Sequence, residues 1–166
     1  STGVTHCPCS NCRLGSGIAP IANMLKKGIN IGLGVDGAAS SDSSHLLNEA
    51  RQSMLLQRLT YDGKKFSARN ALEIATIGGA RVLGRNDLGS IEIGKRADLA
   101  LWKLDELSLA GTWDPIASLI FTGPHYVQSL IVEGRMVVED GRLLSISSKD
   151  IINKAKKSLK ELMDNH

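Results

Sequence analysis

The feature that most constrains the fold is a short apolar segment, Ile29–Val35 (INIGLGV), which ends abruptly at Asp36-Gly37. Its length and its β-branched residues predict a buried parallel strand. A second strand is predicted over residues 2–7, and the apolar spacing of Ile18–Lys27 predicts a helix between the two strands. Because parallel strands need such a crossover connection, the fold class is α/β, built from parallel β/α units.

The rest of the chain changes character near residue 85. Residues 7–17 (CPCSNCRLGSG) are predicted to form a loop. Helices are predicted over Leu46–Leu59, Ser67–Leu83, Asp114–Phe121 and Ser148–Leu162, with Ser67 and Asp114 as N-caps and Pro115 at the first helical position after Asp114. Strands are predicted over Asp87–Ile93 (with a turn), Ala97–Trp102, Tyr126–Val132, Arg135–Glu139 and Arg142–Ile146, with tight turns at Glu133-Gly134 and Asp140-Gly141. We therefore expect a β/α part over residues 1–85, a β-rich part over 86–147 and an amphipathic helix over 148–166.

Composition limits the class of protein. Of the 166 residues, 42% are hydrophobic and 22% are charged, which is a globular profile, and the net charge is only +3. The basic residues form no dense patch interleaved with aromatic residues, so we expect no nucleic-acid partner. No apolar run reaches the roughly 18 residues of a membrane helix, so we expect no membrane partner. Three cysteines within six residues make a poor disulfide framework and favour a reducing, cytoplasmic location.

Two segments offer side chains for chemistry, because reactive groups in β/α folds lie at the carboxyl ends of strands. Asp36 directly follows a predicted strand, where its carboxylate is suited to bind a divalent metal and take a proton from water; alternatively, it caps a turn before Gly37. His6 and the cysteines of HCPCSNC form either a metal cluster or free thiols in a strand-to-helix loop.

Longer stretches carry a family resemblance. THCPCSNCRLGSGIAPI, followed by INIGLGVDGAASSDSSHLLNEARQSMLLQR, resembles the amidohydrolase superfamily, in its branch of guanine, 8-oxoguanine, hydroxyatrazine and chlorotriazine enzymes. ALEIATIGGARVLG, LGSIEIGKRADLALW and VQSLIVEGRMVVEDGRLL resemble the last barrel helices and the C-terminal β-sandwich segment of that family. HCPCSN together with GVDGAASSDSSHLL is most similar to 8-oxoguanine deaminases.

The resemblance implies a (β/α)8 barrel that binds one divalent metal, zinc or iron, and hydrolytically deaminates a small heterocyclic substrate. It implies that Asp36 ends the eighth strand, binds the metal or its water and shuttles protons. Ser10 and Asn11 match the family's SN pair, which borders the substrate, and His6 ends the seventh strand without being a usual metal ligand. Ser40, Ser41 and Asp42 lie on the loop after the eighth strand and shape the pocket, with Ser40 as a substrate-binding residue.

The departures from the family are equally specific. The family's HxH pair is absent, and so are its further metal-binding histidines and its upstream glutamate; the four histidines here are His6, His45, His125 and His166. A single carboxylate does not hold a catalytic zinc, which takes about three protein ligands. We therefore expect the chain to be the C-terminal part of such an enzyme, comprising its last two β/α units, part of the β-sandwich and a terminal helix.

Three hypotheses about function follow from these features. The favoured hypothesis is that the chain is part of a deaminase. On this hypothesis the isolated chain is inactive and holds no metal. It needs the missing N-terminal barrel portion, or forms a homodimer, because open strand edges seek partners. The alternatives are a stand-alone structural or binding protein derived from the enzyme, and a cysteine-cluster metal protein.

Overall fold

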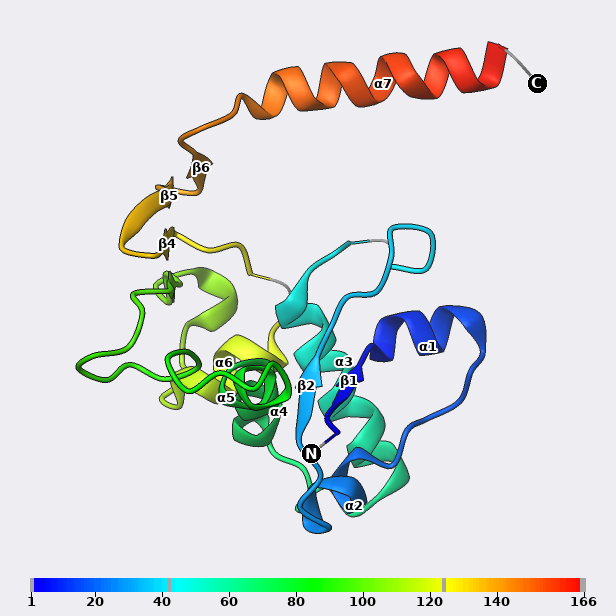
Figure 1. The fold of residues 1–166 in the computed structure, drawn as a ribbon, viewed down its shortest axis with the longest axis vertical. Helices are drawn as coiled ribbons and strands as arrows, with labels where there is room; N and C mark the ends of the chain where they lie inside the picture. The colour runs from blue at the N-terminus through cyan, green and yellow to red at the C-terminus, as the bar shows by residue number, and fades with distance from the viewer. Residues whose placement is uncertain (1, 42, 124, 165–166) are drawn as a thin grey trace. The chain divides into compact units, whose positions relative to one another are not determined.

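Two short strands form the parallel pair that the sequence predicts. β1 (Val4–His6) pairs with β2 (Ile31–Leu33) in parallel, with Thr5 opposite Gly32, and the two strands lie side by side in Figure 1. Both strands are shorter than predicted. This arrangement confirms the α/β character of the N-terminal part, and it sends both carboxyl ends toward the same edge of the pair.

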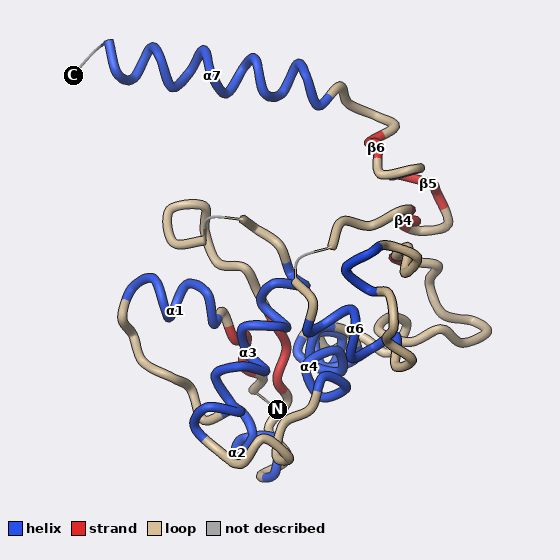
Figure 2. The backbone as a smooth tube through the Cα atoms, turned by 180° about the vertical axis from the view of Figure 1, so that it is seen from behind, coloured by secondary structure: helices blue, strands red, loops and turns tan. Residues whose placement is uncertain are grey.

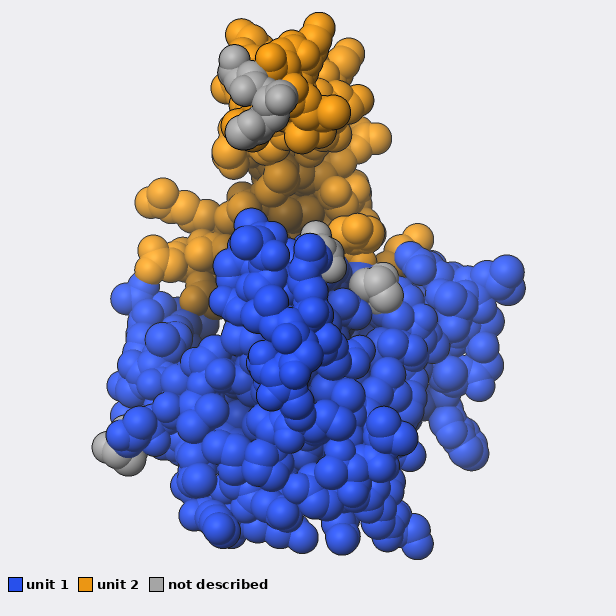
Figure 3. All heavy atoms as spheres, turned by 90° about the vertical axis from the view of Figure 1, so that its right-hand side faces the viewer, with its two compact units in different colours: residues 1–96, 104–125 blue, residues 97–103, 126–166 orange. Residues whose placement is uncertain are grey.

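The computed structural model describes residues 2–41, 43–123 and 125–164. These form two units, which Figure 3 shows in different colours: residues 1–96 with 104–125, and residues 97–103 with 126–166. Segment 104–125 thus belongs to the same unit as the parallel strands. The predicted division of this chain at residues 85 and 147 stays a prediction.

Helices supply most of the regular secondary structure of the first unit, and Figure 2 shows them joined by long loops. Its apolar core joins the strands to these helices, and its most deeply buried side chains include Ile21, Ile31, Met54, Phe66, Ala71, Ile74 and Ile120. The helices are α1 (Pro8–Leu14), α2 (Ile21–Lys26), α3 (Leu46–Thr60), α4 (Ala68–Ala75), α5 (Ile77–Val82), the 3-10 turn η1 (Leu107–Leu109) and α6 (Pro115–Phe121).

The prediction of a loop over residues 7–17 was wrong, because α1 occupies seven of these eleven residues. Pro8 is the first residue of α1, where its missing N–H costs nothing. Gly15 ends the helix in the left-handed conformation (φ 65°), and its N–H reaches the carbonyls of Asn11 and Cys12. Both signals are local, yet the cysteines and polar residues between them are weak helix formers.

The single helix predicted over Ser67–Leu83 was also wrong, because it is two helices, α4 and α5. Thr76 leaves helical geometry (φ −119°, ψ −94°), and its hydroxyl donates to the carbonyl of Leu72 at 2.8 Å. The break lets α5 lie directly against β2. An added Cβ at Gly78 would come within 2.3 Å of the Ile31 carbonyl oxygen, so only glycine permits this approach.

The strand predicted over Asp87–Ile93 does not form. Asp87 instead accepts hydrogen bonds from Arg85 (Nε, 2.9 Å) and Arg96 (Nε, 2.9 Å), and these guanidinium groups hold the pKa of its carboxyl well below the usual range. The segment is therefore a loop closed by ion pairs, and not an alternating strand.

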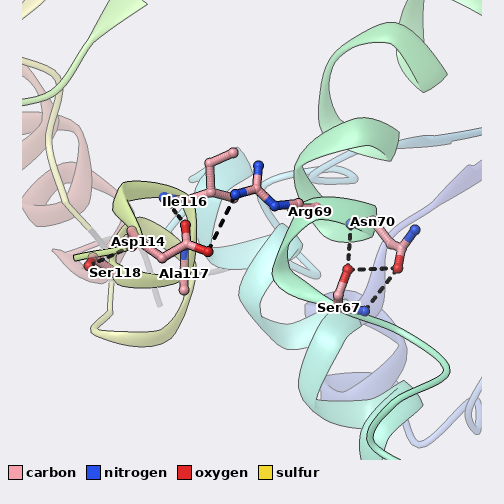
Figure 4. Close-up of polar contacts among 7 residues, drawn as sticks. All are labelled: Ser67, Arg69, Asn70, Asp114, Ile116, Ala117 and Ser118. Atoms are coloured by element: carbon pink, nitrogen blue, oxygen red, sulfur yellow. Dashed lines mark hydrogen bonds and ion pairs between the residues drawn. The ribbon is translucent and has the colours of Figure 1, made fainter. Parts of the chain in front are cut away.

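Two helix starts agree with their predicted caps (Figure 4). Ser67 and Asn70 form a capping box at α4, in which Asn70 N–H donates to the Ser67 hydroxyl at 3.3 Å and Ser67 N–H donates to Asn70 Oδ1 at 2.9 Å. Asp114 accepts two N–H groups of the first turn of α6, and its second oxygen lies 3.4 Å from Arg69 of α4. These contacts confirm both N-terminal predictions and tie α6 to α4.

The second unit is a four-stranded antiparallel sheet in the order β3 (Leu99–Leu101), β4 (Ser129–Val132), β5 (Arg135–Glu139) and β6 (Arg142–Leu143). The predicted tight turns form between β4 and β5 and between β5 and β6. Glu133 (φ 49°) and Asp140 (φ 47°) both take positive φ, and a glycine follows each of them, as short hairpin turns require.

The chain's last helix is α7 (Ser148–Asp164), two residues longer than predicted. None of its described residues is buried, and its exposed apolar side chains include Ile151, Ile152, Leu159, Leu162 and Met163. No described helix combines the length and hydropathy that crossing a membrane requires.

Gly78 and its neighbour Gly79 offer a matched test of the α5–β2 contact. Gly78→Ala should lower the free energy of unfolding by about 1–3 kcal/mol, because its Cβ would overlap the Ile31 carbonyl. Gly79→Ala meets nothing within 4 Å and should be neutral, or stabilising by up to about 1 kcal/mol. Urea denaturation of both variants checks this, and equal effects would contradict the assigned contact.

The burial of His6, the last residue of β1, should make the stability of the fold depend on pH. Its side chain is 3% exposed, and its Nε2 has no hydrogen-bond partner among the described residues. Burial lowers the pKa of His6 to about 4, so the unfolded chain binds more protons between about pH 6.5 and pH 4. Stability should therefore fall as the pH falls through this window.

The measurement is the urea midpoint at several pH values between 7.5 and 4 for the unchanged chain and for His6→Gln. Glutamine does not titrate, so the variant should lose less stability across the window than the unchanged chain. Parallel curves for the two proteins would show that His6 does not cause the acid sensitivity.

Candidate active site

Asp36 stands just past the carboxyl end of β2, on the connection toward α3. Its backbone has φ 63°, a left-handed conformation that aspartate tolerates better than most residues. This conformation begins a turn in which Ser40 N–H and Ser41 N–H both donate to the Gly37 carbonyl. Of the two alternatives given for Asp36, the structure shows the turn, and it also leaves the residue exposed. The metal-binding and proton-transfer role stays a prediction.

Three donors hold the Asp36 carboxylate. Ser10 Oγ donates to Oδ2 at 2.6 Å, Ser40 Oγ donates to the same oxygen at 2.8 Å, and Gly37 N–H donates to Oδ1 at 2.8 Å. These hydrogen bonds, with that of Ser10 the largest influence, lower the pKa of Asp36 below its ordinary value. At neutral pH the site therefore presents an ionised, oriented carboxylate that can accept a proton or bind a cation.

Ser10 comes to this site on α1, which approaches from the end of β1. Beside it, Cys9 N–H donates to Glu49 Oε2 at 2.9 Å, and Glu49 is a fully buried residue of α3. Sequence reasoning missed Glu49. Its only signal was a carboxylate among the apolar positions of the helix over residues 46–59, which is a rare place for an unpaired acidic group.

The other predicted site residues are less closely joined to Asp36. Asn11 is half-buried, and its side chain makes no hydrogen bond within the described segments. Ser41 is buried, and its hydroxyl has no partner among the residues described. Asp42 lies outside the described residues. Ser10, Ser40 and Asp36 thus form one cluster, and Asn11 lies beside it on α1.

The three cysteines are free thiols. Burial raises the pKa of Cys9 to about 12 and also raises that of Cys7, and the nearby carboxylates add to both shifts. In the part of the chain that the structure describes, no three His, Cys, Asp or Glu side chains gather as metal ligands. The cysteine-cluster hypothesis therefore has no support from the geometry.

The absence of a three-ligand group among the described residues also bears on the metal that Asp36 was predicted to bind. Asp36 offers one oxygen ligand, whereas a catalytic zinc takes about three protein ligands. The described residues thus do not compose a metal site by themselves. A cavity of about 300 Å³ lies elsewhere in the first unit, lined by residues of the 111–122 segment such as Thr112, Ala117 and Phe121, and none of the Asp36 cluster lines it.

Known proteins resemble the chain over most of its length. The sequence pattern of the Amidohydrolase family matches residues 1–137. The 8-oxoguanine deaminase of Pseudomonas aeruginosa is 48% identical over 140 residues, which cover 84% of this chain and 31% of that protein.

Solved structures agree with this match. A zinc-bound adenosine deaminase from Xanthomonas campestris superposes with a TM-score of 0.92 at 30% identity, over 98% of this chain and 38% of its own. A mutant atrazine chlorohydrolase of Arthrobacter aurescens, complexed with zinc and atraton, gives a TM-score of 0.87 at 35% identity, over 93% of this chain and 35% of its own.

The chain thus spans about a third of the length of the relatives it matches. Within that third, the family pattern extends from the strand that leads to the SN pair, through Asp36, and into the antiparallel sheet. The resemblance predicted from the sequence is confirmed: the chain belongs to the amidohydrolase family.

Proposed function

We propose that these residues are the C-terminal part of a metal-dependent deaminase that hydrolyses the amino group from a purine-type ring, with 8-oxoguanine or guanine as the favoured substrate. The observation that carries the proposal is the ionised Asp36 carboxylate at the end of β2, fixed by Ser10, Ser40 and the Gly37 N–H. The identity of 48% to an 8-oxoguanine deaminase supports the choice of substrate class.

In this proposal, β1 and β2 are the seventh and eighth strands of a (β/α)8 barrel. Asp36 then contributes one ligand to a divalent metal, zinc as in the solved neighbours or iron, and the other ligands come from strands outside this chain. The second unit contributes part of the β-sandwich. The isolated chain accordingly deaminates nothing, because most of the active centre is supplied by the upstream portion.

Hydrolytic deamination joins a water oxygen to a ring carbon and releases ammonia, so one proton must leave the water and one must reach the departing nitrogen. An ionised carboxylate held at the strand end is suited to carry that proton, because it accepts at neutral pH and donates once protonated. Asn11, which follows Ser10 on α1, is the residue of the SN pair that we propose borders the heterocycle.

A triazine or an adenosine-type ring is the second candidate substrate class. One of the two solved neighbours is an adenosine deaminase and the other is an atrazine chlorohydrolase. We propose the upstream barrel portion as the obligatory partner, with a second copy of the chain as the alternative. The three closely spaced free thiols favour a reducing cytoplasmic compartment.

The test expresses the 166 residues together with the segment encoded upstream of Ser1. It measures ammonia release from 8-oxoguanine, guanine and adenosine, and consumption of the triazine atraton by the loss of its absorbance. The joined protein should bind about one zinc and release ammonia from the purine bases most rapidly, whereas the isolated chain should release none. Asp36→Asn should lower kcat by about 10²–10⁴-fold, because a neutral amide neither accepts nor carries the proton.

Asp150→Asn is the matched control, because Asp150 lies in the first turn of α7 and far along the chain from the cluster. It should keep the kcat of the unchanged protein. Robust metal-dependent turnover by the isolated 166-residue chain would contradict the proposal, as would full activity of Asp36→Asn.

A further inference from the structure

We propose that Ser10 is a positioning residue, which orients the Asp36 carboxylate and does not touch the substrate. This inference deepens the proposed function, since it gives Asp36 its role from that proposal. It also replaces the expectation, drawn from the family resemblance, that Ser10 binds the substrate. The carrying observation is a side chain only 2% exposed whose Oγ lies 2.6 Å from Asp36 Oδ2.

The burial of Ser10 decides between the two roles. A serine hydroxyl has one proton to donate, and here it donates that proton to Asp36. A side chain with almost no exposed surface offers no face for a ligand in the described structure. Asn11, the next residue, is only half-buried and stays available, so the two members of the SN pair separate into one positioning residue and one pocket residue.

The hydrogen bonds also decide which carboxylate oxygen is presented. Each oxygen of a carboxylate has about two acceptor positions. Both positions of Oδ2 are used by Ser10 and Ser40, whereas Oδ1 receives only the Gly37 N–H from the described residues. Oδ1 is therefore the oxygen that remains to bind a cation or to take a proton. The buried Ser10 holds the other oxygen, Oδ2, in place.

The position of Ser10 depends in turn on how α1 is held. A helix of seven residues is not stable by itself, so tertiary contacts must fix it. Glu49 provides such a contact, because its buried carboxyl accepts the N–H of Cys9, which directly precedes Ser10. Glu49 of α3 thus holds the first turn of α1, and α1 in turn places the Ser10 hydroxyl against Asp36.

The first experiment measures the side-chain rotamer of Asp36 in the 166-residue chain at pH 7, without metal or substrate. Three-bond couplings between the backbone and the Asp36 carboxyl carbon report its χ1 angle. The unchanged chain should show one rotamer, whereas Ser10→Ala and the near-isosteric Ser10→Cys should show rotamer averaging, because alanine has no donor and a thiol is a weak one.

Ser53→Ala is the matched control. Ser53 is also fully buried in the first unit, and its hydroxyl has no partner among the described residues. Ser53→Ala should therefore keep the single rotamer of Asp36. This result would show that rotamer averaging in the Ser10 variants comes from the lost hydrogen bond to Asp36 and not from the loss of any buried hydroxyl. An unchanged Asp36 rotamer in both folded Ser10 variants would overturn the proposal, and this outcome would leave the deaminase proposal unaffected.

The second experiment uses the joined, longer protein and separates kcat from KM. A positioning role predicts that Ser10→Ala lowers kcat by about 10–100-fold, as small misplacements of a reacting group do, with KM within about threefold of the unchanged protein. A substrate-binding role predicts the opposite, with a raised KM and a kept kcat, and that result would overturn the inference. Ser53→Ala should change neither constant.

Discussion

The organisation of the site depends on one buried contact, the hydrogen bond from Cys9 N–H to the carboxyl of Glu49. A carboxyl group with no exposed surface is costly to bury without donors. Oε2 of Glu49 accepts the Cys9 N–H, whereas Oε1 has no partner among the described residues. The first turn of a helix supplies such donors, because its N–H groups have no partner within the helix. Glu49 and α1 therefore stabilise each other, and the position of α1 decides where Ser10 lies.

This coupling explains why the sequence predicted Asp36, Ser10 and Ser40 as site residues but missed Glu49 and the hydrogen bonds that join them. Asp36 follows an apolar segment and precedes a glycine, so its place at a strand end can be read from adjacent residues. The hydrogen bond from Ser10 joins residues 26 positions apart, and that from Cys9 to Glu49 joins residues 40 positions apart. No periodicity within a window of ten or fifteen residues contains either relation.

The elements of the fold divide in the same way. Asp114 and Pro115 start α6 as predicted, and the Asp140-Gly141 turn forms as predicted, because a cap and a short turn are decided by neighbouring residues. The region Ser67–Leu83 has a continuous helical pattern, yet it breaks at Thr76 so that Gly78 can approach Ile31 of β2. That packing requirement comes from a strand more than forty residues earlier in the chain, and it overrides local helix propensity.

The extent of the chain and the chemistry of its site agree with each other. The described residues leave Oδ1 of Asp36 with one acceptor position, which suits one bond to a cation or one proton. They gather no group of three His, Cys, Asp or Glu side chains that could hold a metal. The relatives that share this fold are about three times as long, and two that have been solved hold zinc. An oriented carboxylate that supplies a single bond agrees with the proposal that the other metal ligands come from strands outside this chain. The hydrogen bonds that orient Asp36 therefore all come from residues of this chain, whichever groups complete the proposed metal site.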